Sequence, residues 1–275
     1  MNAFIDNRIS LKPSVIVPDI HGRVDFVKKV FSLYNPDEWD IVFTGDILHT
    51  ETDKRHWRRI EKHYVDNCLR PKKFNSEDVK IELAASLGSL KLILERQQSF
   101  PLSVFVLRGN HDDVSCKLFG DYGKFSRITE SGLFRGAMQE LAPFEYGQYL
   151  KYEKTIPYLY IGPGFLASHT IPEKEYKLED IHLNEKNTHY SFCWTDNTAD
   201  RMNGLNVFNK NALNLYGEGM RYWFIGHRPV KENKLYRSQE TGRLIQNNHP
   251  NKWVVLEVPY NGEFIPVRLE SLDSE

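Results

Sequence analysis

Short apolar runs recur along the chain, and several of them are followed at once by polar residues. Five runs rich in Val, Ile, Phe or Leu lie at residues 15–17, 41–43, 104–107, 165–167 and 222–225. Runs of this length and composition are typical of buried β-strands. Between the first two runs, apolar residues recur at helical spacing from Val24 to Tyr34, until Asn35-Pro36-Asp37 ends them. The order of strand, helix and strand indicates a mostly parallel sheet covered by helices.

The middle of the chain predicts helices, and the second half predicts hairpins. Two apolar stripes have helical spacing, and their members are Trp57, Ile60, Tyr64 and Cys68, then Leu83, Leu87, Leu90 and Leu94. Residues 131–141 predict a further helix, whereas the aromatic segment 144–152 is assigned no regular element. Pro163-Gly164 and Asn261-Gly262 mark turns between extended segments, so the second half is expected to lean towards antiparallel pairing.

The length of the chain and the spread of its polar signatures favour one domain. A chain of 275 residues can bury a large core. We expect a single domain over residues 1–275, with a helical insertion at about 51–100 and a loop-rich cover at about 172–206. The cover is expected because that stretch is polar and contains few periodic apolar positions.

Composition excludes some partners and changes little else. The formal net charge is −1 at pH 7 with charges well mixed, so neither nucleic acid nor an anionic membrane is expected as an obligate partner. The three cysteines show no pairing pattern, which favours reduced thiols and a cytoplasmic location. We expect no secretory signal in the charged first 13 residues, and no apolar run is long enough to span a membrane.

Five polar signatures stand at the ends of the five predicted strands. They are Asp19-Ile20-His21-Gly22, Gly45-Asp46, Gly109-Asn110-His111-Asp112, His169 and Gly226-His227-Arg228-Pro229. Taken singly, each is typical of a turn, a helix cap or a buried histidine. Taken together, all five supply an atom able to bind a metal. Residues just past the carboxyl ends of such strands meet at one edge of the sheet. A shared metal site is therefore the favoured interpretation.

The residue types suit two divalent cations. A carboxylate must bridge cations held roughly 3.5–4 Å apart, and we assign this role to Asp46. Asp19 and His21 would complete the protein ligands of the first metal. Asn110, His169 and His227 offer an amide oxygen and two imidazoles for the second, with Asp46 shared.

Such a centre predicts hydrolysis of a phosphate ester by direct attack of a metal-bridging hydroxide. A water held between two cations ionises near neutral pH. The departing alcohol then needs a proton, and His111 is the candidate acid because it follows the ligand Asn110 directly. Asp112 is expected to orient the His111 imidazole.

The same residues give the chain its family resemblance. The signatures resemble the pattern D-x-H, G-D, G-N-H-[D/E], H and G-H of the calcineurin-like metallophosphoesterases, over roughly residues 14 to 230. Within that superfamily, Pro18 to Gly22 and Leu107 to Asp112 are most similar to the phosphoprotein phosphatase branch of bacterial type. The resemblance implies an α/β fold of the α+β sandwich kind. Two mixed β-sheets would pack together, flanked by helices, as four layers α/β/β/α.

The resemblance also implies cofactors and substrate contacts. Two divalent metal ions are expected, with manganese first and iron, zinc, nickel or cobalt as alternatives. Cys193-Trp194-Thr195-Asp196 resembles a family motif after which an Asp-Arg pair binds phosphate, so Arg201 is a candidate for substrate binding. Arg228 and Asn110 are further candidates. Phosphodiesterases and nucleases of the superfamily show G-H-x-H, and Pro229 at the last position therefore favours monoester hydrolysis.

One signature departs from the family. The pattern G-D-x-V-D-R-G is replaced by residues 45–51, where His49 and Thr50 stand in the places of a carboxylate and a phosphate-binding arginine. Either Asp112 and a nearby arginine such as Arg55 compensate, or the substrate sits differently. The spacing from Asp46 to Asn110 is also long for the family, which indicates an insertion beside the site.

The sequence thus predicts an enzyme, a phosphoric ester hydrolase. Its activity is expected to be that of a phosphatase similar to the serine/threonine protein phosphatases. Its partner would be a phosphorylated substrate, namely a phosphoprotein, a nucleotide or a small phosphate ester. The alternative within the fold is a symmetric hydrolase of dinucleoside polyphosphates such as diadenosine tetraphosphate, or of nucleotides. A non-catalytic scaffold is the rival of another class, and the intact ligand set argues against it.

Overall fold

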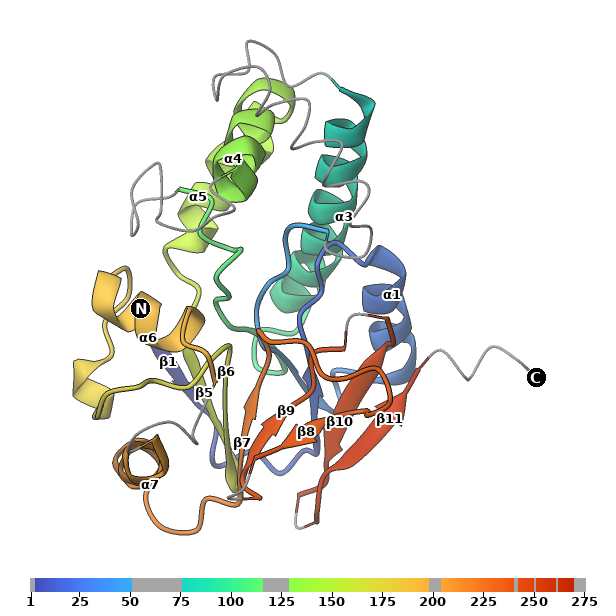
Figure 1. Ribbon diagram of the computed structural model, residues 1–275. Coiled ribbons are helices and arrows are strands. Elements are labelled where there is room, and N and C mark those ends of the chain that lie inside the picture. The colour runs from blue at the N-terminus through green and yellow to red at the C-terminus, as the bar shows by residue number, and fades with distance from the viewer. Residues whose placement is uncertain are drawn as a thin grey trace.

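Two β-sheets pack against one another, and helices cover their outer faces (Figure 1). The computed structural model describes residues 3–50, 76–115, 129–197, 204–239, 242–249, 251–260 and 262–269. The predicted helix over 57–68 lies outside these residues, as does Arg55.

The first sheet contains the strands that lead into the first three signatures. Its order is β11-β10-β2-β3-β4, with bounds β2 Ser14–Val17, β3 Asp40–Phe43, β4 Val104–Val106, β10 Val254–Val258 and β11 Ile265–Arg268. β2, β3 and β4 are parallel, whereas β10 pairs antiparallel with both β2 and β11. The parallel strands bring the segments after Val17, Phe43 and Val106 to one edge of the sheet.

The second sheet holds the strands that lead into the last two signatures. Its order is β1-β5-β6-β7-β9-β8, with bounds β1 Phe4–Asp6, β5 Leu159–Gly162, β6 Phe165–Ser168, β7 Tyr222–Ile225, β8 Arg237–Ser238 and β9 Leu244–Gln246. β5 and β6 form the hairpin predicted at Pro163-Gly164. β6, β7 and β9 are parallel, so this half is more parallel than the turn residues indicated.

Helices lie on both outer faces. α1 Val24–Leu33, α3 Glu77–Ser99, α4 Thr129–Leu141 and α5 Pro143–Glu153 belong to the side of the first sheet. α6 Lys186–Cys193, α7 Gly204–Leu215 and the short 3-10 turn η1 Leu178–Asp180 belong to the side of the second. α5 was not expected from the sequence. No helix among the described residues is both long and apolar enough to cross a membrane.

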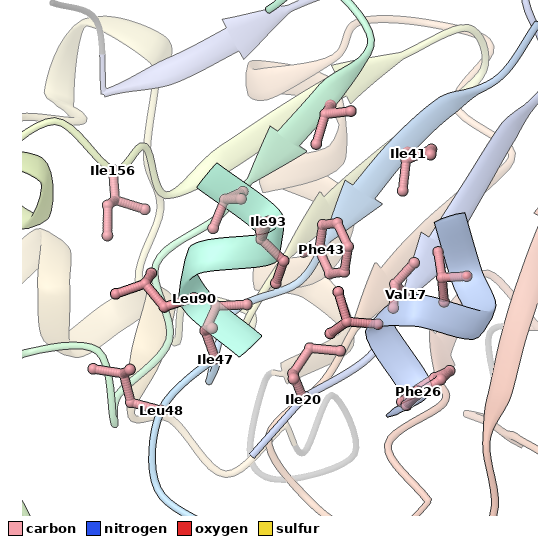
Figure 2. Packing of buried hydrophobic residues seen from close by; sticks show 14 of the residues in the cluster. Val17, Ile20, Phe26, Ile41, Phe43, Ile47, Leu48, Leu90, Ile93 and Ile156 are labelled. Atoms are coloured by element: carbon pink, nitrogen blue, oxygen red, sulfur yellow. The ribbon is translucent and has the colours of Figure 1, made fainter. Parts of the chain in front are cut away.

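The alternation of side chains along the strands divides the core into layers. In β3, Ile41 and Phe43 face the helices of the first sheet, and Val42 faces the second sheet. β2 repeats the pattern, since Ile16 enters the layer between the sheets while its neighbours face the helices. Figure 2 shows Phe43 and Leu90 in the layer between the first sheet and its helices. Both faces of these strands are buried, as the continuous apolar runs predicted.

The expected fold class is confirmed: two mixed sheets lie between helical layers. α1, α3 and α4 lie where the apolar periodicity placed helices, and each of the five predicted strands is present to within a residue or two. The single-domain assignment and its insertion at about 51–100 stay predictions, because residues 51–75 lie outside the described part.

Candidate metal centre

The loops after five strands meet at one edge of the paired sheets. Two groups of donors lie there, Asp19 with His21 and Asp46, and Asp46 with His169 and His227. Within each group the ligand atoms lie within 4.8 Å of one another. Asp46 belongs to both groups, as a bridging carboxylate would.

A backbone carbonyl orients His21 in the first group. Its Nδ1 donates to the carbonyl oxygen of His49 at 2.9 Å. This leaves Nε2 at 3.8 Å from Asp19 Oδ2 and 3.9 Å from Asp46 Oδ2. An imidazole whose other nitrogen is held by a carbonyl is the usual arrangement of a metal-binding histidine.

The second group has the same design. His169 Nδ1 donates to the carbonyl oxygen of Thr44 at 3.0 Å, and its Nε2 lies 3.2 Å from Asp46 Oδ2. Asn110 Oδ1 lies 2.8 Å from His169 Nε2 and 2.9 Å from His227 Nδ1. Asn110 therefore joins the second group.

The atoms that face one another at His169 fit a cation. Because Nδ1 keeps its proton for Thr44, Nε2 of a neutral ring presents a lone pair to the oxygens of Asn110 and Asp46. Burial lowers the pKa of His169, but Asp46 and Asp19 raise it to about 9. In the metal-free protein a proton therefore fills this position, and a divalent cation would satisfy the same three atoms.

The charges of the other donors also suit metal binding. Burial opposes ionisation of Asp46, yet His169 and His111 hold its pKa well below the ordinary value. Burial raises the pKa of Asp19 to about 6, with Asp46 adding to the effect. Burial and the neighbouring His169 lower the pKa of His227 to about 2, which keeps that imidazole neutral.

The backbone of the site adopts conformations that side chains rarely tolerate. His21, Asp46 and His227 have φ values of 47°, 51° and 67°. Left-handed backbone costs roughly 1–2 kcal/mol per non-glycine residue, and such residues cluster at functional sites. Close approach explains two glycines, because a Cβ on Gly109 would overlap Asp46 and one on Gly226 would overlap Asp19.

His111 lies beside the first group, whereas Asp112 has a different contact from the one expected. The His111 ring centroid is 5.4 Å from that of His21, and its backbone N–H donates to Asp46 Oδ1 at 2.8 Å. Oδ2 of Asp112 instead accepts the backbone N–H groups of Asp46 at 2.8 Å and Gly109 at 2.9 Å, and Oδ1 accepts that of Ile47 at 3.0 Å. Asp112 thus joins the two ligand loops, and its expected role in orienting the His111 ring stays a prediction.

The candidate substrate-binding arginines have different outcomes. Arg201 lies outside the described residues. Arg228 is half exposed at the rim and forms an ion pair with Asp196. The ring centroid of Trp194 lies 6.5 Å from that of His227, so the segment that ends at residue 197 borders the site.

Arg108 forms buried ion pairs and has a structural role beside the site. Its side chain is 1% exposed, and Nη2 lies 2.9 Å from Glu153 Oε1 and 3.3 Å from Asp113 Oδ1. Nη1 donates to Asn184 Oδ1 at 3.0 Å. These contacts fix the strand end that carries Asn110.

Sequence reasoning missed Asn248. Its Nδ2 donates to Asp19 Oδ2 at 2.6 Å and to the carbonyl oxygen of His227 at 3.2 Å. Asn248 lies two residues past β9, in which only Leu244 and Ile245 are apolar, so the sequence signal before it is weaker than at the five signatures. The residue links both donor groups.

The fold and the two donor groups that share Asp46 are those expected of a metal-dependent hydrolase. The family model of the calcineurin-like phosphoesterases matches residues 13–231. The chain belongs to this family and is a phosphoric ester hydrolase, for which divalent metal ions are the implied cofactors.

Solved structures agree on the fold at low sequence identity. A serine/threonine phosphatase from Saccharomyces cerevisiae with similarity to human PP5 has a TM-score of 0.63 at 14% identity, over 97% of this chain and 83% of that one. A protein proposed to be a diadenosine tetraphosphatase has 0.52 at 15%, over 98% of both chains. A cold-active protein-tyrosine phosphatase of Shewanella has 0.51 at 17%, over 98% and 81%. No curated protein matches the sequence.

Proposed function

We propose that the protein is a manganese-dependent phosphatase that hydrolyses a phosphomonoester. The observation that carries the proposal is the sharing of Asp46 between two buried donor groups. Asp19, His21 and Asp46 would hold one ion, and Asp46, Asn110, His169 and His227 the other.

Bound cations would supply the nucleophile, by acidifying a water, and would neutralise charge on the phosphoryl oxygens. The protein's own residues would orient the ligands and supply the proton. The backbone carbonyls of His49 and Thr44 hold the imidazoles of His21 and His169 in the tautomer that leaves Nε2 available. His111 lies at the edge of the first group and is proposed to protonate the departing alcohol.

The first donor group supports a monoester as substrate. Pro229 stands in the sequence where phosphodiesterases of the superfamily carry a further histidine. The carboxylate of Asp19 accepts a hydrogen bond from the side-chain amide of Asn248. The first ion would therefore keep positions open beside Asp19, His21 and Asp46.

The proposal predicts a preference between two simple substrates. With added Mn²⁺, we expect the purified protein to hydrolyse an aryl phosphate monoester faster than the matching diaryl phosphate. Release of the aryl alcohol measures both rates under identical conditions. A faster rate on the diester would contradict monoester specificity, and no rate on either would contradict the enzyme.

Replacing His111 with asparagine tests its role as the acid. General acid catalysis contributes roughly 10²–10⁴-fold, so kcat on an alkyl phosphate is expected to fall within that range. The fall should be much smaller on a nitrophenyl phosphate, because that leaving group needs no proton. Equal losses on both substrates would contradict the assignment.

A dinucleoside polyphosphate is the second candidate substrate. The observation that favours it is the departure at His49 and Thr50, where the family's phosphate-binding arginine is absent and Thr50 instead contacts Glu82. Comparing kcat/KM on diadenosine tetraphosphate with that on a phosphopeptide separates the two substrates, since the higher value identifies the class.

A further inference from the structure

Helix α3 contacts the turn that follows the bridging ligand. Ser86 Oγ accepts the backbone N–H of His49 at 3.1 Å. Glu82 Oε1 accepts the backbone N–H of Thr50 at 2.9 Å, and Oε2 accepts the Thr50 hydroxyl. The Ser86 hydroxyl donates to Glu82 Oε1 at 3.1 Å. The two α3 side chains thus hold both residues of the 49–50 turn.

The same turn holds a metal-ligand candidate. His49 receives the Nδ1 proton of His21 on its carbonyl oxygen at 2.9 Å while its own N–H contacts Ser86. The position of this carbonyl decides where His21 Nε2 points. Because His49 has a φ of 64°, its conformation depends on the contacts around it.

The contact is buried and closely packed. Glu82 is 3% exposed and Ser86 is fully buried. A Cβ on Gly22 would lie 3.3 Å from the backbone nitrogen of Ser86, so α3 packs directly on the loop that carries His21. Side chains in such packing hold one arrangement.

We propose that Ser86 and Glu82 are positioning residues, through which helix α3 sets the orientation of His21 for the first metal. This inference rests on the proposed metal centre. It assigns part of the site to a helix that carries none of the sequence signatures.

Serine variants of α3 allow a matched test, because a backbone carbonyl cannot itself be replaced. Ser86→Ala removes the acceptor of the His49 N–H. Ser89→Ala removes a hydroxyl equally buried on the same helix, for which no partner exists among the described residues. Partners behind a metal ligand contribute roughly 10–100-fold in affinity, and we expect the lower end, about tenfold, for this indirect contact.

Calorimetric titration with Mn²⁺ measures the affinities. The Ser86→Ala protein is expected to bind one of two ions about tenfold more weakly and the other unchanged, whereas Ser89→Ala matches the wild type. In the metal-free proteins, long-range ¹H–¹⁵N spectra of the His21 ring should show loss of the single Nδ1–H form in Ser86→Ala alone.

Two variants of Glu82 separate positioning from charge. Glu82→Gln keeps an oxygen for Thr50 and Ser86 but loses the charge, so it should bind Mn²⁺ more tightly than Glu82→Ala. The inference would be overturned if Mn²⁺ binding were weakened equally in both Glu82 variants, or if Ser86→Ala and Ser89→Ala bound Mn²⁺ with equal affinity. Either result would leave the proposed function intact. A wild-type protein that binds no Mn²⁺ would instead overturn the function.

Discussion

Asp46→Asn is expected to lower kcat by at least about a thousandfold. Metal ions contribute several kcal/mol of transition-state stabilisation, and each ~1.4 kcal/mol is a factor of ten. The amide would lack the charge that Asp46 brings to both groups, where Oδ2 lies 3.2 Å from His169 Nε2 and 3.9 Å from His21 Nε2. Turnover of an aryl phosphate with Mn²⁺ measures the loss.

Asp37→Asn is the matched control, because that carboxylate is exposed and precedes β3, at the opposite end of the strand from Asp46. It should retain full activity. A fully active Asp46→Asn protein would show that Asp46 does not bridge the metals. A scaffold would be indicated if partner binding survived in Asp46→Asn and the wild type showed no turnover.

Removing the metals is expected to abolish activity and to lower the melting temperature. Mn²⁺ at about one hundred times its Kd would stabilise the fold by ~2.7 kcal/mol. For a domain of this size that corresponds to roughly 5 to 10 °C. The physical reason is the cluster of buried donors, in which Asp19 and Asp46 repel one another without a cation.

Scanning calorimetry of chelator-treated protein, with and without Mn²⁺, measures the shift. Asp46→Asn serves as the control and should show a much smaller shift, since one substitution weakens both donor groups. An unchanged melting temperature and full activity after chelation would contradict the metal centre.

Local pattern was sufficient for the five strands that precede the signatures but not for all helices. β2 and β3 are continuous apolar runs because both of their faces are buried. α5 was missed because Gly147 and its aromatic residues have low helix propensity, and the buried Tyr149 stabilises the helix through tertiary packing instead. Turn residues identified the β5–β6 hairpin but carried no information on the parallel pairing of β6 with β7.

The site shows the same division. Spacing after each strand identified the ligand candidates, because parallel strands carry their following residues to one edge. The contacts of Asp112 with the Asp46 loop, and of Asn248 with Asp19, join segments far apart in the chain. Such contacts depend on how two sheets pack, so no spacing along the sequence could show them.

Residue type and the periodicity of short segments alone determined the strands before the signatures and the set of candidate donor residues. The family and the two-sheet fold followed from the resemblance that those donor residues carry. Tertiary structure decided which atoms the donors present and what holds them. His21 and His169 offer Nε2 because carbonyls of His49 and Thr44 take the other nitrogen. Backbone carbonyls thus decide which ring nitrogen stays available. Every residue has a backbone carbonyl, so residue types in the sequence do not reveal which carbonyl will lie beside which imidazole.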